Sequence, residues 1–158
     1  MKSAAAVIVV WLAFGSIANA VECSLDQLTV VKDDGPFDFV VEVARTPDEQ
    51  ARGLMFRSSL DRDAGMIFIM EPERQANFWM RNTMISLDLI FIERSGRVES
   101  VAANAIPYSE KKLSSQGPVR AVLEINGGLS ASLGIVPGVQ IVHPAFDEAP
   151  AEHRCSGS

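Results

Sequence analysis

The chain has 158 residues, of which 47% are hydrophobic, so it is long enough for one domain with a sizeable core. Its 20 acidic residues outnumber its 14 basic ones, and the formal net charge is −6. Contacts with phosphate groups need a basic surface, so this charge argues against nucleic acids and anionic membranes as partners.

Residues 1–20 have the features of a secretory signal peptide. Lys2 precedes an apolar run over residues 4–17, and Ala18-Asn19-Ala20 gives the small-x-small pattern that precedes a cleavage site. The run is short for a membrane anchor, and Glu22 before Cys23 argues against lipid attachment. Cleavage would remove one base and no acid, which gives a mature charge of −7. We therefore expect a periplasmic or secreted protein with no stable membrane anchor.

The first part of the mature chain predicts a hairpin followed by a short helix. Residues 28–32 and 37–44 flank the turn 33–36 with alternating apolar side chains, which is typical of paired strands. Thr46, Pro47 and Glu49 then match a capping box at a helix start. Gly53 limits this helix to about two turns, because glycine is a poor helix former.

The rest of the chain predicts further short strands and one more short helix. The strands are expected over 65–70 (ended by Glu71-Pro72-Glu73), 77–80, 84–93, 98–105, 119–125 and 139–143, with a loop over 106–118 and a helix over 126–134. About eight strands separated by tight turns favour a mainly β (α+β) fold, a compact β-barrel-like sheet with two short helices, because closing or folding a sheet protects its edges. The domain would span 21–143, and the tail 144–158 is expected to be mobile.

Cys23 and Cys155 stand near the two ends of the mature chain. In an exported protein such a pair invites a disulfide, whose loop of 132 residues would add roughly 4–5 kcal/mol of stability in the chain-entropy model. The alternative is two separate thiols on mobile chain ends.

The sequence carries no recognised catalytic motif. His143 and His153 are the only histidines, and neither has a nucleophile at useful spacing. We find no nucleophile elbow, phosphate loop or zinc motif, and so predict no catalytic residue, cofactor or metal site. Asp88 and Glu124 could act as a carboxylate pair, or they could be ordinary acids at strand edges and on the surface.

Five methionines fall within thirty positions: Met55, Met66, Met70, Met80 and Met84. Thioethers are soft ligands that select Cu(I), so copper binding is one interpretation. Core filling is the simpler one, since methionine packs irregular cores readily.

A cluster of polar and amphipathic side chains interrupts the apolar runs around residue 80. Its members, with two arginines near the first helix, are Arg52, Arg57, Trp79, Arg81, Asn82, Thr83 and Asp88. Side chains alternate along a strand, so Phe78 and Met80 should face the core while Trp79 and Arg81 face a pocket or the surface. Asn82 and Thr83 would turn the chain. A buried Asp88 would need a partner, which Arg52 or Arg57 could supply.

The segments "RGLMFR", "GMIFIM", "FWMRNT…LDLIFI" and "LEINGG…GIVPGVQIV", in this order, resemble the family called domain of unknown function 192. The resemblance runs from about Leu28 to Val142. It implies a small single domain with a β-barrel-like sheet, often exported, and no established activity. Relatives often carry a Cys in the loop that reads "YSEKKLSSQ" here.

The leading functional hypothesis is a periplasmic small-ligand-binding or accessory module, whose partner is a small molecule or an envelope protein. Its expected binding residues are Arg52, Trp79, Arg81, Asn82 and Asp88. The alternatives are a carboxylate-dependent, hydrolase-type enzyme, an interaction protein with an exposed apolar patch, and methionine-based copper binding. A concave pocket at these residues would favour binding, and a solid interior would favour a structural role.

We predict that the exported protein begins at residue 21, because the small-x-small pattern ends at Ala20. The mass of the protein isolated from its native host decides this. A membrane-bound product that retains residues 1–20 would contradict it.

Overall fold

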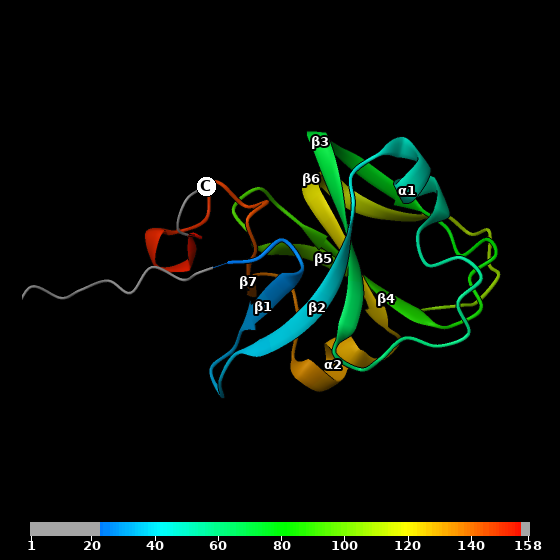
Figure 1. Ribbon diagram of the computed structural model, residues 1–158, viewed down its shortest axis with the longest axis horizontal. Coiled ribbons are helices and arrows are strands. Elements are labelled where there is room, and N and C mark those ends of the chain that lie inside the picture. Colours follow the sequence, from blue (N-terminus) through cyan, green and yellow to red (C-terminus); the bar gives the residue numbers. More distant parts are fainter. Residues whose placement is uncertain (1–22, 156–158) are drawn as a thin grey trace, which may run out of the picture.

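The structure is a computed structural model that describes residues 23–155. The predicted leader, residues 1–20, lies outside the described residues. Within them, seven strands form one curled sheet, a half-barrel, with two short α-helices beside it (Figure 1). The elements are β1 (Gln27–Val31), β2 (Phe37–Ala44), α1 (Pro47–Arg52), β3 (Ala64–Phe78), β4 (Leu87–Ile92), β5 (Val98–Ala105), β6 (Leu113–Asn126), α2 (Leu129–Leu133), β7 (Gln140–Val142) and the 3-10 helix η1 (Ala151–His153). The mainly β fold with two short helices agrees with the sequence prediction.

The strand order in the sheet is β5-β4-β6-β3-β2-β1-β7. Neighbours pair antiparallel except β2 and β3, whose parallel pairing requires the crossover that contains α1. At one edge of the sheet, β7 pairs with β1. Residues in and just before β7 also form hydrogen bonds with residues at the start of β5. Val98 N–H donates to the Val139 carbonyl, and Ile141 N–H donates to the Gly96 carbonyl. These bonds bring the two ends of the sheet together and produce its curl.

The first hairpin and α1 form as the sequence predicts. Thr46 accepts a hydrogen bond from Glu49 N–H, and the Glu49 carboxylate accepts from Thr46 N–H, which is the reciprocal capping box. α1 ends at Arg52, and Gly53 follows it with a φ of 48°. A Cβ at this glycine would lie 3.2 Å from the Phe68 ring, so both the backbone conformation and the close packing favour glycine here.

β3 differs from the prediction, because it continues through Pro72 to Phe78 as one bent strand. The pairing with β6 is in register up to Ile69 opposite Ala121, and it resumes at Arg74 opposite Val119. Residues 70–73 therefore bulge opposite Arg120 alone. The bulge accommodates a proline, which cannot donate a ladder hydrogen bond. β6 likewise starts at Leu113, inside the expected loop, and β4 starts at Leu87 rather than at Met84.

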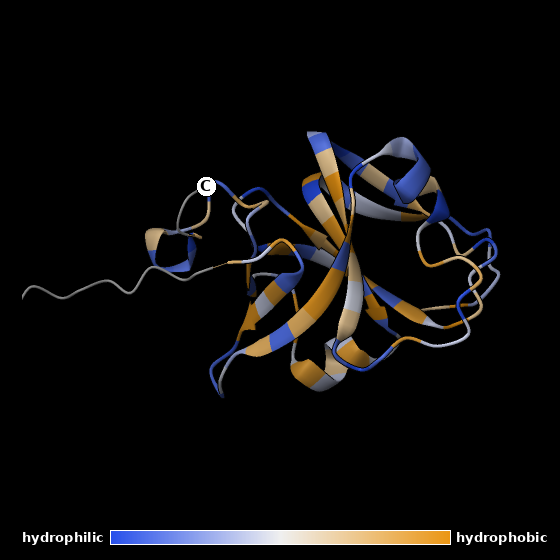
Figure 2. Ribbon diagram, viewed as in Figure 1, coloured by the Kyte–Doolittle hydropathy of each residue, from blue (hydrophilic) through white to orange (hydrophobic). Residues whose placement is uncertain are grey.

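The sheet separates two apolar clusters, because alternate side chains of each strand point to opposite faces. The inner cluster holds Phe39, Ile67, Ile90 and Leu123 and is completed by side chains of α2 and of the tail. The outer cluster holds Phe68, Met70, Leu89 and Phe91 and lies on the α1 side. Figure 2 shows the apolar colour concentrated in the strands, whereas α1 is largely hydrophilic. The outer cluster therefore needs loops as well as α1 to cover it.

The tail was expected to be mobile, but over residues 144–155 it packs on the sheet. Ala145, Phe146 and Ala149 are buried in the inner cluster. Arg120 Nε donates to the Ala145 carbonyl at 3.1 Å, and Arg94 forms ion pairs with Asp147 and Glu148. The buried Phe146 ring and the bonds from Arg94 and Arg120 hold this tail in place, although its composition alone suggested disorder.

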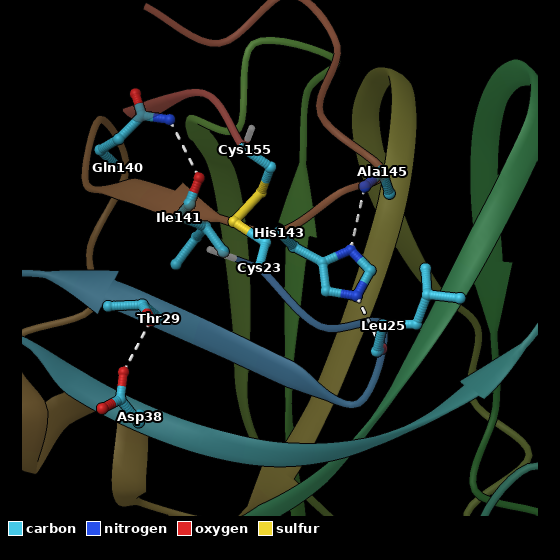
Figure 3. Close-up of a disulfide and its surroundings, with 9 residues drawn as sticks. All are labelled: Cys23, Leu25, Thr29, Asp38, Gln140, Ile141, His143, Ala145 and Cys155. Carbon is cyan, nitrogen blue, oxygen red and sulfur yellow. Dashed lines mark hydrogen bonds between the residues drawn. A yellow bond between two sulfur atoms is a disulfide. The ribbon is translucent and has the colours of Figure 1, made fainter. Parts of the chain in front are cut away.

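The two chain ends meet at a disulfide between Cys23 and Cys155, whose Cα atoms are 5.4 Å apart (Figure 3). Beside it, the buried His143 ring accepts a hydrogen bond from Ala145 N–H at Nδ1. Its Nε2 therefore carries the proton and donates to the Leu25 carbonyl at 3.0 Å. Burial lowers the pKa of His143, which keeps the ring neutral in this arrangement. This histidine links the two termini and has no nucleophile beside it in the structure described.

We expect denatured, unreduced protein to have no reactive thiols. The double variant Cys23→Ser/Cys155→Ser should lose roughly 4–5 kcal/mol of unfolding free energy, because the bridge closes a loop of 132 residues. Thiol titration and denaturant melts measure the two effects. Two reactive thiols per chain in freshly exported protein would contradict the bridge.

Candidate functional site

A pocket of about 320 Å³ lies between the end of α1 and the outer face of the sheet. Residues 50–55 form one wall, side chains of β3 between Phe68 and Phe78 form another, and Trp79, Thr83 and Glu124 complete it. The volume lies at the lower end of the range for small-molecule sites. The outer face of the sheet is therefore hollowed beside Arg52 and Trp79, whereas Asn82 and Asp88, which were expected in the same pocket, do not line it.

Gln50 fixes α1 over the sheet. Its side-chain amide donates to the Ile69 carbonyl of β3 at 2.7 Å and to the Ala44 carbonyl of β2 at 3.3 Å. Its side-chain oxygen accepts from the Arg74 guanidinium at 3.2 Å. One side chain thus sets the width of the pocket and holds an arginine at its rim.

Burial alternates along the "FWMRNT" stretch, but Phe78, which was expected to face only the core, also lines the pocket. Met80 is buried, and Phe78 packs edge-on against Phe68 with ring centroids 5.0 Å apart. Trp79 is 48% exposed, and it lines the pocket together with Phe78. The Arg81 guanidinium lies 4.2 Å from the centroid of the Trp79 ring. This cation–π contact orients the indole at the rim.

Three loops meet next to the pocket, at the right-hand end of the molecule in Figure 1. Phe56 N–H donates to the Asn82 carbonyl, and Tyr108 N–H donates to the Thr83 carbonyl. Phe56, Asn82 and Tyr108 all have positive φ values, which are uncommon outside glycine. The loops that carry Asn82 and Thr83 are therefore fixed by bonds between backbones. Several large apolar side chains on these loops are exposed: Phe56, Met84, Ile106 and Tyr108.

Glu124 was considered only as a carboxylate partner of Asp88 and was not among the five residues expected to bind a ligand, yet it lines the pocket. It lies on β6 between Met66 of β3 and Leu89 of β4, and only 5% of it is exposed. It lines the pocket, and no other side chain or backbone group within residues 23–155 forms a hydrogen bond with its carboxyl group. Burial raises the pKa of Glu124 to about 8, because a charged carboxylate is poorly solvated among apolar neighbours. The pocket therefore contains an uncharged carboxylic acid at neutral pH.

Asp88 corrects the sequence-based expectation. It is fully buried, but neither Arg52 nor Arg57 reaches it. Its carboxylate accepts from the N–H groups of Asn104, Gly128 and Ser130 at 2.7–2.9 Å, and from the Ser130 hydroxyl at 2.6 Å. Gly128 precedes α2 and has no side chain to cap it, so Asp88 satisfies these helix-start groups instead. Asp88 is a structural anchor for α2.

The two carboxyl groups considered as a pair lie on opposite faces of the sheet. Asp88 stands opposite Ile125 and Glu124 stands opposite Leu89 in the β4–β6 ladder. Directly opposite residues share a face, so Asp88 faces the inner side and Glu124 the outer side. A catalytic dyad of these two acids is thereby ruled out.

Of the five residues expected to bind ligand, Arg52 and Trp79 line the pocket. Arg81 stacks on Trp79 and pairs with Glu110 at 2.9 Å, and Asn82 contacts Met55 of the pocket wall. Asp88 lies elsewhere, and Arg57 pairs with Glu42.

The signal for Glu124 was present in the sequence: an acid inside the apolar run "VRAVLEI" on the same face as Val122. Among the methionines, Met66, Met70 and Met80 are buried in the outer cluster, which is the core-filling role.

A family model matches residues 29–143, the range that contains nearly all of the sheet, α1 and the pocket. The chain belongs to the DUF192 family. That family is described as an uncharacterised ACR and carries no assigned activity. A search among curated proteins gives no match.

Two crystal structures have the same fold as this chain. A protein of unknown function from Novosphingobium aromaticivorans is 46% identical, with a TM-score of 0.72, covering 82% of this chain and 98% of its own. A Sinorhizobium meliloti protein described as a candidate transcription regulator is 33% identical, with a TM-score of 0.74, covering 79% of this chain and 98% of its own. These likenesses support the fold and leave the activity of this DUF192 member open.

Residues 23–155 show neither a membrane-spanning helix nor a metal-binding cluster. No helix there is long and apolar enough to cross a membrane. No group of three or more His, Cys, Asp or Glu side chains there is arranged to hold a metal ion.

Glu124 predicts an unusual dependence of stability on pH. Its folded pKa of about 8 exceeds its ordinary value of 4.5, so the folded chain keeps a proton that the unfolded chain releases. This contribution is complete below pH 4.5 and is lost as pH rises toward 8. Between pH 5 and pH 8, wild-type protein should lose on the order of 3–4 kcal/mol relative to Glu124→Gln.

Denaturant melts of wild type and Glu124→Gln at both pH values measure this difference. The contributions of the other titrating groups are common to both proteins and cancel in the comparison. Glu152→Gln, at an exposed acid on η1, is the matched control and should leave the pH dependence unchanged. A wild-type-minus-variant difference that stays constant with pH would show that Glu124 is ionised in the folded protein.

Proposed function

We propose that this DUF192 protein is an exported small-ligand-binding module and that the pocket beside α1 is its binding site. The observation that supports this most directly is Glu124, a nearly buried acid that borders an open pocket and has no hydrogen-bond partner among residues 23–155. Buried polar groups are normally hydrogen-bonded, and an unsatisfied one costs free energy. A bound ligand is the natural partner for such a group.

The walls of the pocket have the composition of a ligand site. Phe68, Phe78, Met70 and Trp79 supply apolar and aromatic surface, and a few polar groups are spaced around it. Small-molecule sites combine this kind of apolar lining with a small number of placed polar groups. Because Gln50 and the capping box fix α1, the pocket is formed before a ligand arrives.

Export is part of the proposal. The leader-like residues 1–20 and the disulfide that closes the described domain are both compatible with an oxidising compartment. The description of the Sinorhizobium relative points instead to transcription. The acidic balance of this chain gives little support to DNA contacts, so we expect no nucleic-acid partner.

A second candidate is acid–base catalysis in the same pocket by Glu124 alone. A raised pKa in a cleft is what a general acid needs. This alternative requires turnover of a bound molecule, whereas binding requires only a saturable complex. Recovery of an unchanged ligand after a long incubation supports the binding function over catalysis.

The protein supplies its own optical probe for the binding test. Its two tryptophans are Trp11, inside the predicted leader, and Trp79, so a chain that starts at residue 21 has Trp79 alone, at the pocket. We expect members of a library of small organic acids, amides, alcohols and amines to change Trp79 emission in a saturable way and to raise the melting temperature.

A pocket-filling variant makes the test specific. Ala51 is exposed and lines the pocket, so Ala51→Phe should occupy part of the space and weaken binding at least tenfold. Ala103→Phe, at an exposed alanine of β5 outside the pocket, is the matched control and should bind as wild type does. The proposal fails if no compound changes Trp79 emission, or if compounds act equally on wild type and Ala51→Phe.

A further inference from the structure

We propose that the ligand is a small organic monocarboxylate whose carboxylate accepts a hydrogen bond from the Glu124 carboxyl group, while Arg52 and Arg74 supply the positive charge. This inference rests on the proposed function, because it assigns a ligand class to that same pocket.

The charges that face Glu124 favour an anion. Among the described residues that line the pocket, Arg52 at the end of α1 and Arg74 of β3 are the bases, and Glu124 of β6 is the one acid. The other polar lining residues, Gln50, Asn77, Thr83 and Trp79, carry no charge at neutral pH. The lining charge is therefore positive whether or not Glu124 holds its proton, and an ammonium ligand would face two guanidinium groups.

These two arginines remain available to a ligand. Arg74 donates to the Gln50 side-chain oxygen, which leaves its charge without a carboxylate, and Arg52 has no hydrogen bond or ion pair with another described residue. Nearby arginines differ in this respect, since Arg57 pairs with Glu42 and Arg81 pairs with Glu110. Unpaired guanidinium groups at a pocket rim suit a carboxylate, with which they form charge-assisted hydrogen bonds.

Glu124 contributes a donor rather than a charge. Its raised pKa keeps the carboxyl group protonated at neutral pH, so the O–H can donate to a ligand oxygen. A bond from a carboxylic acid to a carboxylate is among the stronger hydrogen bonds in proteins. The proton stays on Glu124 and is donated to the ligand in a hydrogen bond, so the ligand binds with full affinity only while Glu124 is protonated. Above pH 8 each complex must first take up a proton.

The apolar walls define the rest of the ligand. Leu54, Phe68, Met70 and Phe78 surround the space beside the acid, and the Trp79 ring stands at its rim. A volume of about 320 Å³ suits a compact apolar or aromatic body rather than a chain of several residues. Because the pocket wall offers one carboxylic acid donor, we expect the ligand to carry one carboxylate.

Three probes of similar shape separate the chemistry. Benzoate is an anion, benzamide is neutral, and benzylammonium is a cation. At pH 6.5 we expect benzoate to bind with saturable changes in Trp79 emission, benzamide to bind at least tenfold more weakly, and benzylammonium to be excluded. At pH 9 benzoate should bind roughly tenfold more weakly, because Glu124 then loses its proton.

Variants assign the effect to residues. Glu124→Gln retains a neutral donor, so it should bind benzoate several-fold more weakly than wild type does at pH 6.5. Its own affinity for benzoate should be the same at pH 6.5 and at pH 9, because the amide does not titrate. Glu124→Leu removes the donor and should lose at least tenfold. Arg52→Gln and Arg74→Gln should each lose roughly tenfold, as charge-assisted contacts do. Arg62→Gln, at an exposed arginine outside this pocket, is the control and should bind as wild type does.

The outcomes distinguish this inference from the proposed function. Tighter binding of benzylammonium or benzamide than of benzoate, or library ligands that include no carboxylate, would overturn the carboxylate assignment and leave the binding site in place. Loss of the pH dependence in Glu124→Gln supports the role of the acid, whereas the same pH dependence in that variant overturns it. Failure of the Ala51→Phe comparison would overturn the binding site itself.

Discussion

The pairing of β3 with β6 is the interaction on which the rest of the structure depends. These two long strands lie side by side near the middle of the sheet, and each sends alternate side chains to the inner and outer clusters. Their ladder is broken at residues 70–73 of β3 and again opposite Ala76. A bulge bends a strand and changes its twist. The bends lead the chain into Trp79 and into the loop that holds Asn82, so the pocket lies where the ladder is irregular.

The same alternation explains why two acids in similar sequence surroundings have opposite roles. Asp88 and Glu124 each interrupt an apolar strand, and both are buried. Asp88 faces the start of α2, where unpaired N–H groups converge and satisfy its carboxylate. Glu124 faces the pocket, where no donor from the described part of the chain bonds to it, and burial raises its pKa. Which face an acid occupies depends on strand register, and register determines whether it stabilises the fold or remains available to a ligand.

Local features could be predicted from the sequence, and long-range ones could not. The hairpin, the capping box of α1 and the alternation of Phe78, Trp79 and Met80 depend on residues close together in the chain. The continuation of β3 through Pro72 depends on a bulge against β6, and the packing of the tail depends on Arg94 and Arg120. For the site, Arg52 and Trp79 were selected because they are unusual in their local context, and both line the pocket. The partners of Asp88 come from 16 to 42 positions away, and no local pattern points to them.

The energetic cost of Glu124 is itself an argument for a role in binding. At pH 7 the unfolded chain ionises this acid and the folded chain does not, which costs on the order of 3 kcal/mol of stability. A leucine or methionine at this position would join the outer cluster around Phe68 and Leu89 without that cost. A domain of this size typically has only 5–15 kcal/mol of net stability, so the cost is a substantial fraction of it. Packing does not account for an acid here, whereas the proposed ligand would accept a hydrogen bond from the Glu124 O–H and supply the missing interaction. The instability of the empty pocket and the affinity of the filled one then have the same physical origin.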